Sequence, residues 1–384
     1  MELPPQGERH RQDPTQWWAT LEQAFAKLDL KKLNPVALAI DGTSGTVLAV
    51  DEKGAPLSMG SMYNDVARAG DAAAIGEVAP EGSQARGKTS PLARALEIRD
   101  GAVRILHQAD WLMGRFCDRY DLSDENNALK TGYDPVSRKW PAWIEKTGLP
   151  SSLLPRVLPA GTAVGKISAG MAEHFHLPKG LTVVTGTTDG CAAFLASGAR
   201  DFGDGVTSLG TTLTLKLLSK NPIFAPQYGI YSHRVGDQWL AGGASNSGGA
   251  ALLQFFSARQ MDEMTPRLKP DVPTELNYYP LPAIGERFPV NDAQYAPRVT
   301  PRPLDDAIFF QGLLEGVADV EALGYRRLQE FGATPLKSIR SLGGGASNTP
   351  WTSIRRRKLG VPVLPTLSEH AAVGTALLAW RGVS

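Results

Sequence analysis

Four segments of the sequence combine glycines with an acid or with hydroxyl side chains, each after a short apolar run. They are Asp41–Gly45 (DGTSG), Gly186–Gly190 (GTTDG), Gly210–Thr212 (GTT) and Gly343–Asn348 (GGGASN). Glycine lets the backbone turn tightly, so that its N–H groups can approach a phosphate or a sugar closely. A carboxylate at such a turn can accept a proton from a reacting hydroxyl. One turn of this kind is usually only a turn, but four in order indicate chemistry on phosphate and sugar.

A fifth segment, Gly82–Thr89 (GSQARGKT), fits the phosphate-binding pattern GxxxxGK[ST]. A P-loop requires a buried strand before the pattern and a helix directly after it. The preceding residues 75–81 (IGEVAPE) contain a glycine, a proline and two acids, which make a poor strand. We therefore expect a surface loop in which Thr89 or Ser90 caps the next helix, and a P-loop NTPase is a competing hypothesis.

The elements that position these turns alternate between strand and helix patterns. Asp13-Pro14 is a helix start signal, and Trp17, Trp18 and Phe25 follow at helical spacing as core residues. Further helices are expected over 92–112 (with a break near Gly101), 191–197, 252–256, 308–331, 350–359 and 369–380. Strands are expected over 36–40, 46–50, 182–185, 205–210, 212–218, 238–240, 339–342 and 361–364. This alternation predicts an α/β fold, interrupted by an extended excursion over the proline-rich residues 265–304.

Composition limits the class of protein. The 384 residues suggest two or three domains, and the net charge of +1 gives no field to attract nucleic acid or an anionic membrane. The two cysteines argue against a disulfide framework, and the six histidines show no metal-binding spacing, so no metal site is expected from protein ligands. The run Arg355–Lys358 (RRRK) is expected to be a solvated helix face. The polar start and the absence of a long apolar run favour a cytoplasmic protein without a membrane partner.

With these segments in order, the chain resembles the FGGY family of carbohydrate kinases. The segments Gly186–Ala193 (GTTDGCAA), Ser208–Thr212, Leu342–Asn348 and Glu369–Ala376 resemble the family's catalytic, phosphate, adenosine and closing-helix motifs. Gln108–Leu112 (QADWL) also matches, and Met62–Asp65 (MYND) with Arg68 is similar to the sugar-side Trp-x-Asp-x-Arg segment. Ala39–Leu48 and Asn127–Pro135 look closest to the small ribulose/xylulose kinase branch of plants and cyanobacteria.

The resemblance implies a two-domain actin/hexokinase/Hsp70-like (ribonuclease H-like) ATPase fold. It implies a sugar-binding domain over 1–204 and a nucleotide-binding domain over 205–384. The cofactors would be ATP and Mg²⁺, with no nucleic acid as partner, and the protein would be a monomer or a homodimer.

The resemblance also implies a role for individual residues. Asp189 would be the catalytic base that accepts the proton of the sugar hydroxyl, and it would contact the substrate. Thr43, Ser44 and Asp65 would bind the sugar beside it, as would Tyr63, which stands where the family usually has Trp. ATP phosphates would lie at Gly210, Thr211 and Thr212. Residues Gly344, Gly345 and Asn348 would line the adenine pocket.

The family's first phosphate loop, an Asp-x-Gly-Thr after the first strand, has no counterpart at the expected place. Asp41 follows the Trp17-Trp18 helix, where the family has its second, sugar-side strand, so Asp41 is not expected to be the Asp of that first loop. This implies an N-terminal domain incomplete at its start, through a misassigned start, a truncation or a degenerate kinase. The leading hypothesis is ATP-dependent phosphorylation of a ketopentose, D-ribulose first. The alternatives are a D-xylulose kinase and a protein that binds sugar or nucleotide without transfer.

Overall fold

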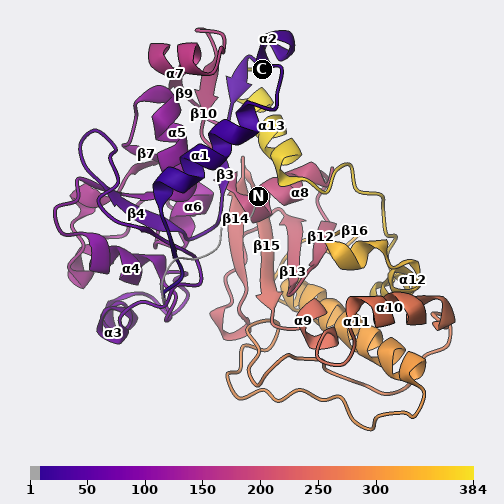
Figure 1. Cartoon of the computed structure of the whole chain (residues 1–384). Coiled ribbons are helices and arrows are strands. Elements are labelled where there is room, and N and C mark those ends of the chain that lie inside the picture. Colours follow the sequence, from indigo (N-terminus) through magenta and orange to yellow (C-terminus); the bar gives the residue numbers. More distant parts are fainter. Residues whose placement is uncertain (1–8) are drawn as a thin grey trace. The chain divides into compact units, whose positions relative to one another are not determined.

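The computed structural model describes residues 9–384, which fold into two compact units (Figure 1). The first unit comprises the chain up to Ala196 together with His370–Ser384, and the second comprises Ser197–Glu369. The sequence-based division placed 205–384 in one domain, whereas the structure packs the last helix, α13 (Ala371–Arg381), with the first unit. The roles assigned to the two domains remain predictions.

The second unit is built on one five-stranded sheet in the order β14-β15-β13-β12-β16. Its strands are β12 (Asp204–Leu209), β13 (Leu213–Ser219), β14 (Tyr231–Val235), β15 (Gln238–Ser245) and β16 (Ser338–Leu342). Its helices are α9 (Gly249–Leu252), α10 (Ala258–Met264), α11 (Asp306–Glu330) and α12 (Thr349–Leu359). Only the β12–β16 pairing is parallel, and the long helix α11 covers β13 and β15 with a buried apolar face (Figure 1).

The first unit contains several small sheets. Its strands are β1 (Arg11–Gln12), β2 (Ala37–Leu38), β3 (Asp41–Gly42), β4 (Val47–Val50), β5 (Gly60–Ser61), β6 (Arg104–His107), β7 (Leu122–Asp124), β8 (Arg156–Leu158), β9 (Ala163–Lys166), β10 (Thr182–Val184) and β11 (Thr187–Thr188). They pair in the orders β1-β5-β4-β6, β2-β10-β9, β11-β3 and β7-β8. Besides α13, its helices are α1 (Pro14–Phe25), α2 (Leu30–Leu33), α3 (Ala69–Val78), α4 (Pro91–Ile98), α5 (Gln108–Cys117), α6 (Glu125–Leu129), α7 (Ala169–His174) and α8 (Asp189–Ala196).

The start of α1 follows the sequence signal. The Asp13 carboxylate accepts a hydrogen bond from the Thr15 backbone N–H at 2.9 Å, and Pro14 occupies the first helical position. Trp17 and Trp18 are buried, and the Trp18 ring packs against Phe116 and Phe175. The prediction that both tryptophans belong to the core is confirmed.

The expected helical stretch over 92–112 is wrong in its middle. Residues 104–107 form β6, which pairs antiparallel with β4, and Ile105 and Leu106 are both buried. Gly101 takes a positive φ of 75° just before this strand, a conformation that ends helical backbone. A strand buried on both faces lacks the alternation of apolar and polar residues that would separate it from a helix.

Two other assignments also differ from the sequence prediction. Asp41 and Gly42, expected as a turn, form β3 and pair parallel with β11. The strand expected over 238–240 is longer in the structure, because the glycine-rich residues 242–245 continue β15, which pairs with β13 over Trp239–Ser245. A Cβ on Gly242 would lie 1.9 Å from the Leu215 carbonyl oxygen, so the glycine is what allows this close pairing.

The GSQARGKT segment lies between α3 and α4 and consists of turns. The element before it is the helix α3 rather than a strand, so the context that a P-loop requires is missing at this segment. Ser90 caps α4 by accepting a hydrogen bond from the Ala93 backbone N–H at 3.1 Å, as one of the two expected caps. The Lys88 side chain is exposed.

The expectation that Arg355–Lys358 is a solvated face is wrong for its first member. Arg356 and Arg357 are exposed, but Arg355 has 0% exposure in the core of the second unit. Its guanidinium donates to the Glu321 carboxylate at 2.7 and 2.8 Å and to Ser341 Oγ at 2.7 Å. Across the described residues, every helix is too short or too polar to cross a bilayer.

Helices α8 and α13 approach each other very closely at Gly374 (Figure 1). A Cβ built on Gly374 would lie 1.9 Å from the Ala192 carbonyl oxygen, so a larger residue must push the two helices apart. We expect Gly374→Ala to lower the free energy of unfolding of the first unit by about 1–3 kcal/mol, as for other overpacked cores. Urea unfolding of the two proteins measures this difference.

Gly70 in α3 provides the matched control, because it is exposed and a Cβ there would meet nothing within 4 Å. Gly70→Ala is expected to leave stability unchanged or to raise it by up to about 1 kcal/mol through helix propensity. Equal stability of the two variants would contradict the close α8–α13 contact.

Candidate active site

In the second unit, two of the glycine-rich turns meet at one edge of the sheet. β12 and β16 are parallel neighbours with Ser208 opposite Leu342, so their carboxyl ends lie side by side. Gly210–Thr212 follows the first strand and Gly343–Asn348 follows the second. A Cβ on Gly343 would lie 3.0 Å from the Leu209 carbonyl oxygen and 3.3 Å from the Gly210 nitrogen, so the turns are in contact. Ligands of α/β sheets typically bind outside the carboxyl ends of the strands.

The three residues predicted for the adenine pocket contribute differently to this edge. Gly344 is exposed, and a Cβ there would have open space around it. Gly345 packs under the Trp351 ring, where a Cβ would lie 2.4 Å from a ring carbon. Asn348 caps α12 by accepting from the Trp351 N–H at 2.9 Å, and its amide donates to Thr265 Oγ1 at 3.2 Å. Asn348 therefore fixes the shape of the loop, and the backbone of Gly344 is accessible to solvent.

The predicted phosphate turn presents its hydroxyls outward. Thr211 is exposed and Thr212 is half-buried, and neither hydroxyl makes a hydrogen bond within residues 9–384. The backbone of the turn, in contrast, is fixed by hydrogen bonds from the start of α9. The Gly210 and Thr211 carbonyls accept from the N–H groups of Gly249 (2.9 Å) and Ala250 (3.0 Å).

In the first unit, the two other turns also meet at the ends of neighbouring parallel strands. β3 and β11 pair with Asp41 opposite Thr187, so Thr43 and Ser44 leave the sheet at the same edge as Asp189. The Thr43 N–H donates to Gln108 Oε1 at 3.0 Å, which fixes this turn to the start of α5. Ser44 Oγ is shielded from solvent and has no hydrogen-bond partner in the described part of the chain. An unpaired hydroxyl of this kind is costly unless a ligand or water satisfies it.

Asp189 is the first residue of α8 and its side chain is exposed. Its carboxylate accepts a hydrogen bond from the Gly190 N–H at 2.6 Å. The neighbouring Asp41 is half-buried. Its burial, with the nearby charge of Asp189, raises the pKa of Asp41 above its ordinary value, against the opposing effects of hydrogen bonds from its own backbone and from Thr375. From the sequence, Asp41 was excluded only as the Asp of a first phosphate loop and was given no role. The parallel pairing of its strand with β11 was not visible in the sequence.

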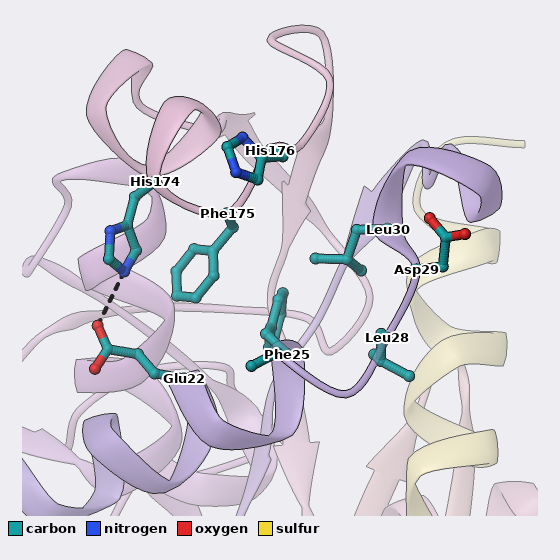
Figure 2. A pocket seen from close by; sticks show the side chains of 9 residues that line it. Glu22, Phe25, Leu28, Asp29, Leu30, His174, Phe175 and His176 are labelled. Atoms are coloured by element: carbon teal, nitrogen blue, oxygen red, sulfur yellow. Dashed lines mark hydrogen bonds and ion pairs between the residues drawn. The ribbon is translucent and has the colours of Figure 1, made fainter.

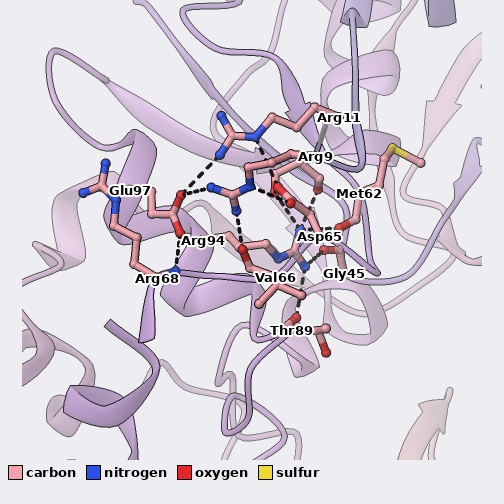
Figure 3. Close-up of polar contacts among 11 residues, drawn as sticks. Arg9, Arg11, Gly45, Met62, Asp65, Val66, Arg68, Thr89, Arg94 and Glu97 are labelled. Atoms are coloured by element: carbon pink, nitrogen blue, oxygen red, sulfur yellow. Dashed lines mark hydrogen bonds and ion pairs between the residues drawn. The ribbon is translucent and has the colours of Figure 1, made fainter. Parts of the chain in front are cut away.

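The predicted sugar contact of Asp65 is already occupied by protein groups. Figure 3 shows that Arg9 and Arg11 each form ion pairs with both Asp65 and Glu97. Asp65 is 1% exposed and accepts from Arg9 at 2.8 Å, Arg11 at 3.2 Å and Ser61 Oγ at 2.8 Å. These bonds oppose the effect of burial, which is the largest single influence, and leave the pKa of Asp65 below its usual range. Tyr63, in contrast, is 56% exposed.

A buried polar network lies next to β11. Asn126 Nδ2 donates to Thr187 Oγ1 at 3.0 Å, and the Asp124 carboxylate accepts from the Asn126 and Asn127 N–H groups at 2.8 and 3.1 Å. Burial raises the pKa of Asp124 to about 7, and the charge of Asp110 adds to this effect. Asp110 in turn lies 2.6 Å from His107 Nδ1. Asp124 and Asn126 were not predicted to support the site, and only their burial next to β11 identifies them.

The raised pKa of Asp124 predicts a pH dependence of stability. Between about pH 4 and 7 the folded chain holds a proton on Asp124 that the unfolded chain has released, so stability falls as the pH rises through this window. We expect the gain in unfolding free energy from pH 7.5 to 5.5 to be smaller in Asp124→Asn than in the wild type, by on the order of 1 kcal/mol. Urea unfolding at the two pH values measures it. Asp100→Asn, at an exposed site of the same unit, should keep the wild-type pH response, and an unchanged response in Asp124→Asn would refute the assignment.

The first unit also has a pocket that includes none of the predicted site residues (Figure 2). It lies between the end of α1, α2 and the end of α7, with Phe25 and Phe175 in its wall. His174 and Glu22 close one side through a 3.0 Å contact.

Comparison with known proteins assigns a family to the second half of the chain. Residues 205–383 match the profile of the C-terminal domain of the FGGY family of carbohydrate kinases. Residues 205–383 are an FGGY C-terminal domain. The recognition drawn from the sequence motifs is thereby confirmed, and both glycine-rich turns of the second unit lie inside the FGGY C-terminal domain. The match also includes α13, which folds with the first unit.

The curated relatives that match most of the chain are kinases. The autoinducer-2 kinase of Yersinia pestis (biovar Antiqua, strain Angola) is 27% identical over 298 residues, which cover 72% of this chain and 56% of that protein. The chain thus spans about half the length of the curated relatives it matches.

Solved structures confirm the fold class beyond the FGGY C-terminal domain. The xylulose kinase of Rhodospirillum rubrum has a TM-score of 0.82 at 21% identity, covering 99% of this chain and 83% of that one. The Plasmodium falciparum glycerol kinase with ADP has a TM-score of 0.81 at 16% identity, covering 100% of this chain and 83% of that one. The fold is therefore the two-domain actin-like ATPase fold of these kinases, as the sequence resemblance implied.

Proposed function

We propose that this chain transfers the γ-phosphoryl group of ATP to a hydroxyl of a ketopentose, with D-ribulose as the preferred substrate. The observation that carries the proposal is the pairing of β3 with β11, because it places an exposed carboxylate, Asp189, at the same sheet edge as the hydroxyl turn Thr43–Ser44. Hydroxyl side chains and a carboxylate are groups that bind sugar hydroxyls and accept a proton from one of them. The FGGY C-terminal domain supports the assignment to sugar kinases.

In this proposal the nucleotide binds at the carboxyl ends of β12 and β16. The N–H groups and hydroxyls of Gly210, Thr211 and Thr212 would bind phosphate oxygens, and Gly344, Gly345 and Asn348 would shape the adenine pocket. Phosphoryl transfer depends mostly on positioning and on electrostatic stabilisation of the phosphate charge. Asp189 would orient the attacking sugar hydroxyl and accept its proton.

Mg²⁺ would enter this site with ATP. It is usually held by substrate phosphates, water and one or two carboxylates rather than by a full set of protein ligands. Among residues 9–384 no three His, Cys, Asp or Glu side chains gather as a metal site, but the neighbouring carboxylates Asp41 and Asp189 fit the smaller requirement. When bound, the ion would neutralise phosphate charge.

The sugar specificity is a proposal drawn from the sequence resemblance. Ser44 Oγ, which has no partner in the described structure, would hydrogen-bond a sugar hydroxyl, and Tyr63 would lie against the sugar. Asp65 would have to exchange one of its bonds to Arg9, Arg11 or Ser61 for a bond to the sugar. The oligomeric state, a monomer or a homodimer, and the cytoplasmic location remain predictions from the sequence.

Sugar-dependent release of ADP tests the proposal. The chain would be offered ATP and Mg²⁺ with D-ribulose, D-xylulose, L-ribulose, glycerol or autoinducer-2 in turn, and kcat/KM would be compared. We expect D-ribulose to give the highest value. A higher value for D-xylulose would reassign the substrate within the ketopentoses, and a higher value for glycerol or autoinducer-2 would overturn the substrate class. Binding of sugar and ADP without any release would favour a protein that binds without transfer.

A further inference from the structure

The second unit contains a buried carboxylate that none of the predicted site motifs includes. Glu286 is 3% exposed and lies in the proline-rich excursion over 265–304, which contains none of the predicted site residues. A buried carboxylate is costly unless hydrogen bonds satisfy it. The groups that hydrogen-bond to Glu286 therefore identify the segments that this carboxylate holds in place.

Four short hydrogen bonds converge on Glu286, and all four donors are neutral. Oε2 accepts from Ser245 Oγ at 2.6 Å and from the Tyr279 hydroxyl at 2.9 Å. Oε1 accepts from the backbone N–H groups of Asn246 at 2.7 Å and of Arg287 at 2.8 Å. Two of the four donors, Ser245 and Asn246, belong to the segment in which β15 ends.

The segment that begins with Ser245 and Asn246 holds the predicted phosphate turn Gly210–Thr212 in place. Because Ser245 Oγ donates its hydrogen to Glu286, its lone pairs are free to accept the Ser247 N–H at 2.9 Å. The Ser247 carbonyl then accepts the Leu213 N–H at 2.7 Å, directly after the Gly210–Thr212 turn.

The residues after Ser247 also contact the Gly210–Thr212 turn. Gly249 N–H donates to the Gly210 carbonyl at 2.9 Å. A Cβ on Gly248, whose φ is 132°, would lie 2.9 Å from the Thr212 carbonyl carbon, so side chains are excluded where the two segments touch. A continuous series of bonds thus runs from Glu286 through Ser245 and Ser247 to the turn.

We propose that Glu286 is a positioning residue for the phosphate-binding turn Gly210–Thr212, through its hold on Ser245 and Asn246. This inference rests on the proposed function, since it takes that turn as the place where ATP phosphates bind. A turn that binds phosphate through backbone N–H groups works only if those groups are fixed in direction before the ligand arrives. Glu286 would hold the turn rigid through Ser245 and Ser247 without contacting a substrate itself.

The test compares the affinities for ADP and for adenosine by calorimetry, with Mg²⁺ present. Glu286→Gln keeps the size of the side chain, but its amide nitrogen cannot accept the Ser245 hydroxyl hydrogen. We expect it to weaken ADP binding at least tenfold while adenosine and D-ribulose affinities stay within twofold of the wild type. A general loss of packing in the unit would weaken adenosine as much as ADP.

Tyr279→Phe is the matched control, because it removes another donor to the same carboxylate without touching the segment behind the turn. It should leave ADP affinity within twofold. If Glu286→Gln does not fold, Ser245→Ala breaks the same series one step later and should also weaken ADP selectively. Unchanged ADP affinity in folded Glu286→Gln or Ser245→Ala, or equal losses for ADP and adenosine, would overturn the inference while wild-type ADP binding still supports the nucleotide site. A wild-type chain that binds no ADP would refute the nucleotide site itself.

Discussion

Replacing Asp189 by Asn is expected to lower kcat for sugar phosphorylation by about 10²–10⁴-fold, the usual range for loss of a general base. The amide has the shape of the carboxylate but cannot take up the proton of the attacking hydroxyl at neutral pH. The side chain is exposed, and within residues 9–384 its one hydrogen bond comes from the Gly190 N–H, which an amide oxygen can also accept, so the fold should persist. Steady-state kinetics with D-ribulose and ATP, together with a thermal unfolding curve, measure both effects.

Asp100→Asn is the control for this substitution, because Asp100 is an exposed acid of the same unit outside the site. It should keep kcat within twofold of the wild type. If Asp189→Asn also stayed within twofold while D-ribulose was turned over, Asp189 would not be the base.

The second large effect concerns stability and is expected from Arg355→Ala. Arg355 and Glu321 are both fully buried, and Glu321 also accepts from Thr207 Oγ1 at 2.6 Å. Removing the arginine leaves the Glu321 charge in the core without its partner, and such a change costs about 3–5 kcal/mol. Urea unfolding followed by a probe in the second unit should show a loss of this size.

Arg356→Ala, one position along α12 and exposed, provides the comparison and should change stability by no more than about 0.5 kcal/mol. The double variant Glu321→Gln with Arg355→Met removes both charges, so it should be more stable than Arg355→Ala alone. Equal stability of Arg355→Ala and Arg356→Ala would show that the buried ion pair is not formed.

The parts of the site that sequence reasoning located are those encoded locally. A strand, a glycine turn and a helix start are neighbours in sequence, so the turns after β12 and β16 were predicted at the right residues. The segment Gly186–Gly190 was expected to be a turn, whereas Thr187 and Thr188 form β11 and α8 begins at Asp189. The pairing that brings Thr43 and Ser44 to the same sheet edge as Asp189 was not visible, because β3 and β11 are separated by most of the first unit. Asp41 was therefore assigned to a turn, although it lies in a strand beside the one that leads to Asp189.

Residues that act over long sequence separations were missed for the same reason. Four consecutive helical positions span about 300° around the axis, so one of Arg355–Lys358 had to face the packed side, but the sequence did not show that Glu321 would meet it. Glu286 lies in a segment without periodicity, and it contacts Ser245 across a separation of 41 residues. Asp65 was assigned to the sugar by motif alone, whereas Arg9 and Arg11 bind it from more than fifty positions away.

We propose that one chain carries both a sugar site and a nucleotide site and transfers a phosphoryl group from the nucleotide to the sugar. The most direct measurement follows γ-labelled ATP incubated with the chain, Mg²⁺ and D-ribulose, with separation of the products. We expect label in a pentulose phosphate, formed only when the sugar is present and lost in Asp189→Asn. Label that stays in ATP, or that appears only as inorganic phosphate although both ligands bind, would contradict it.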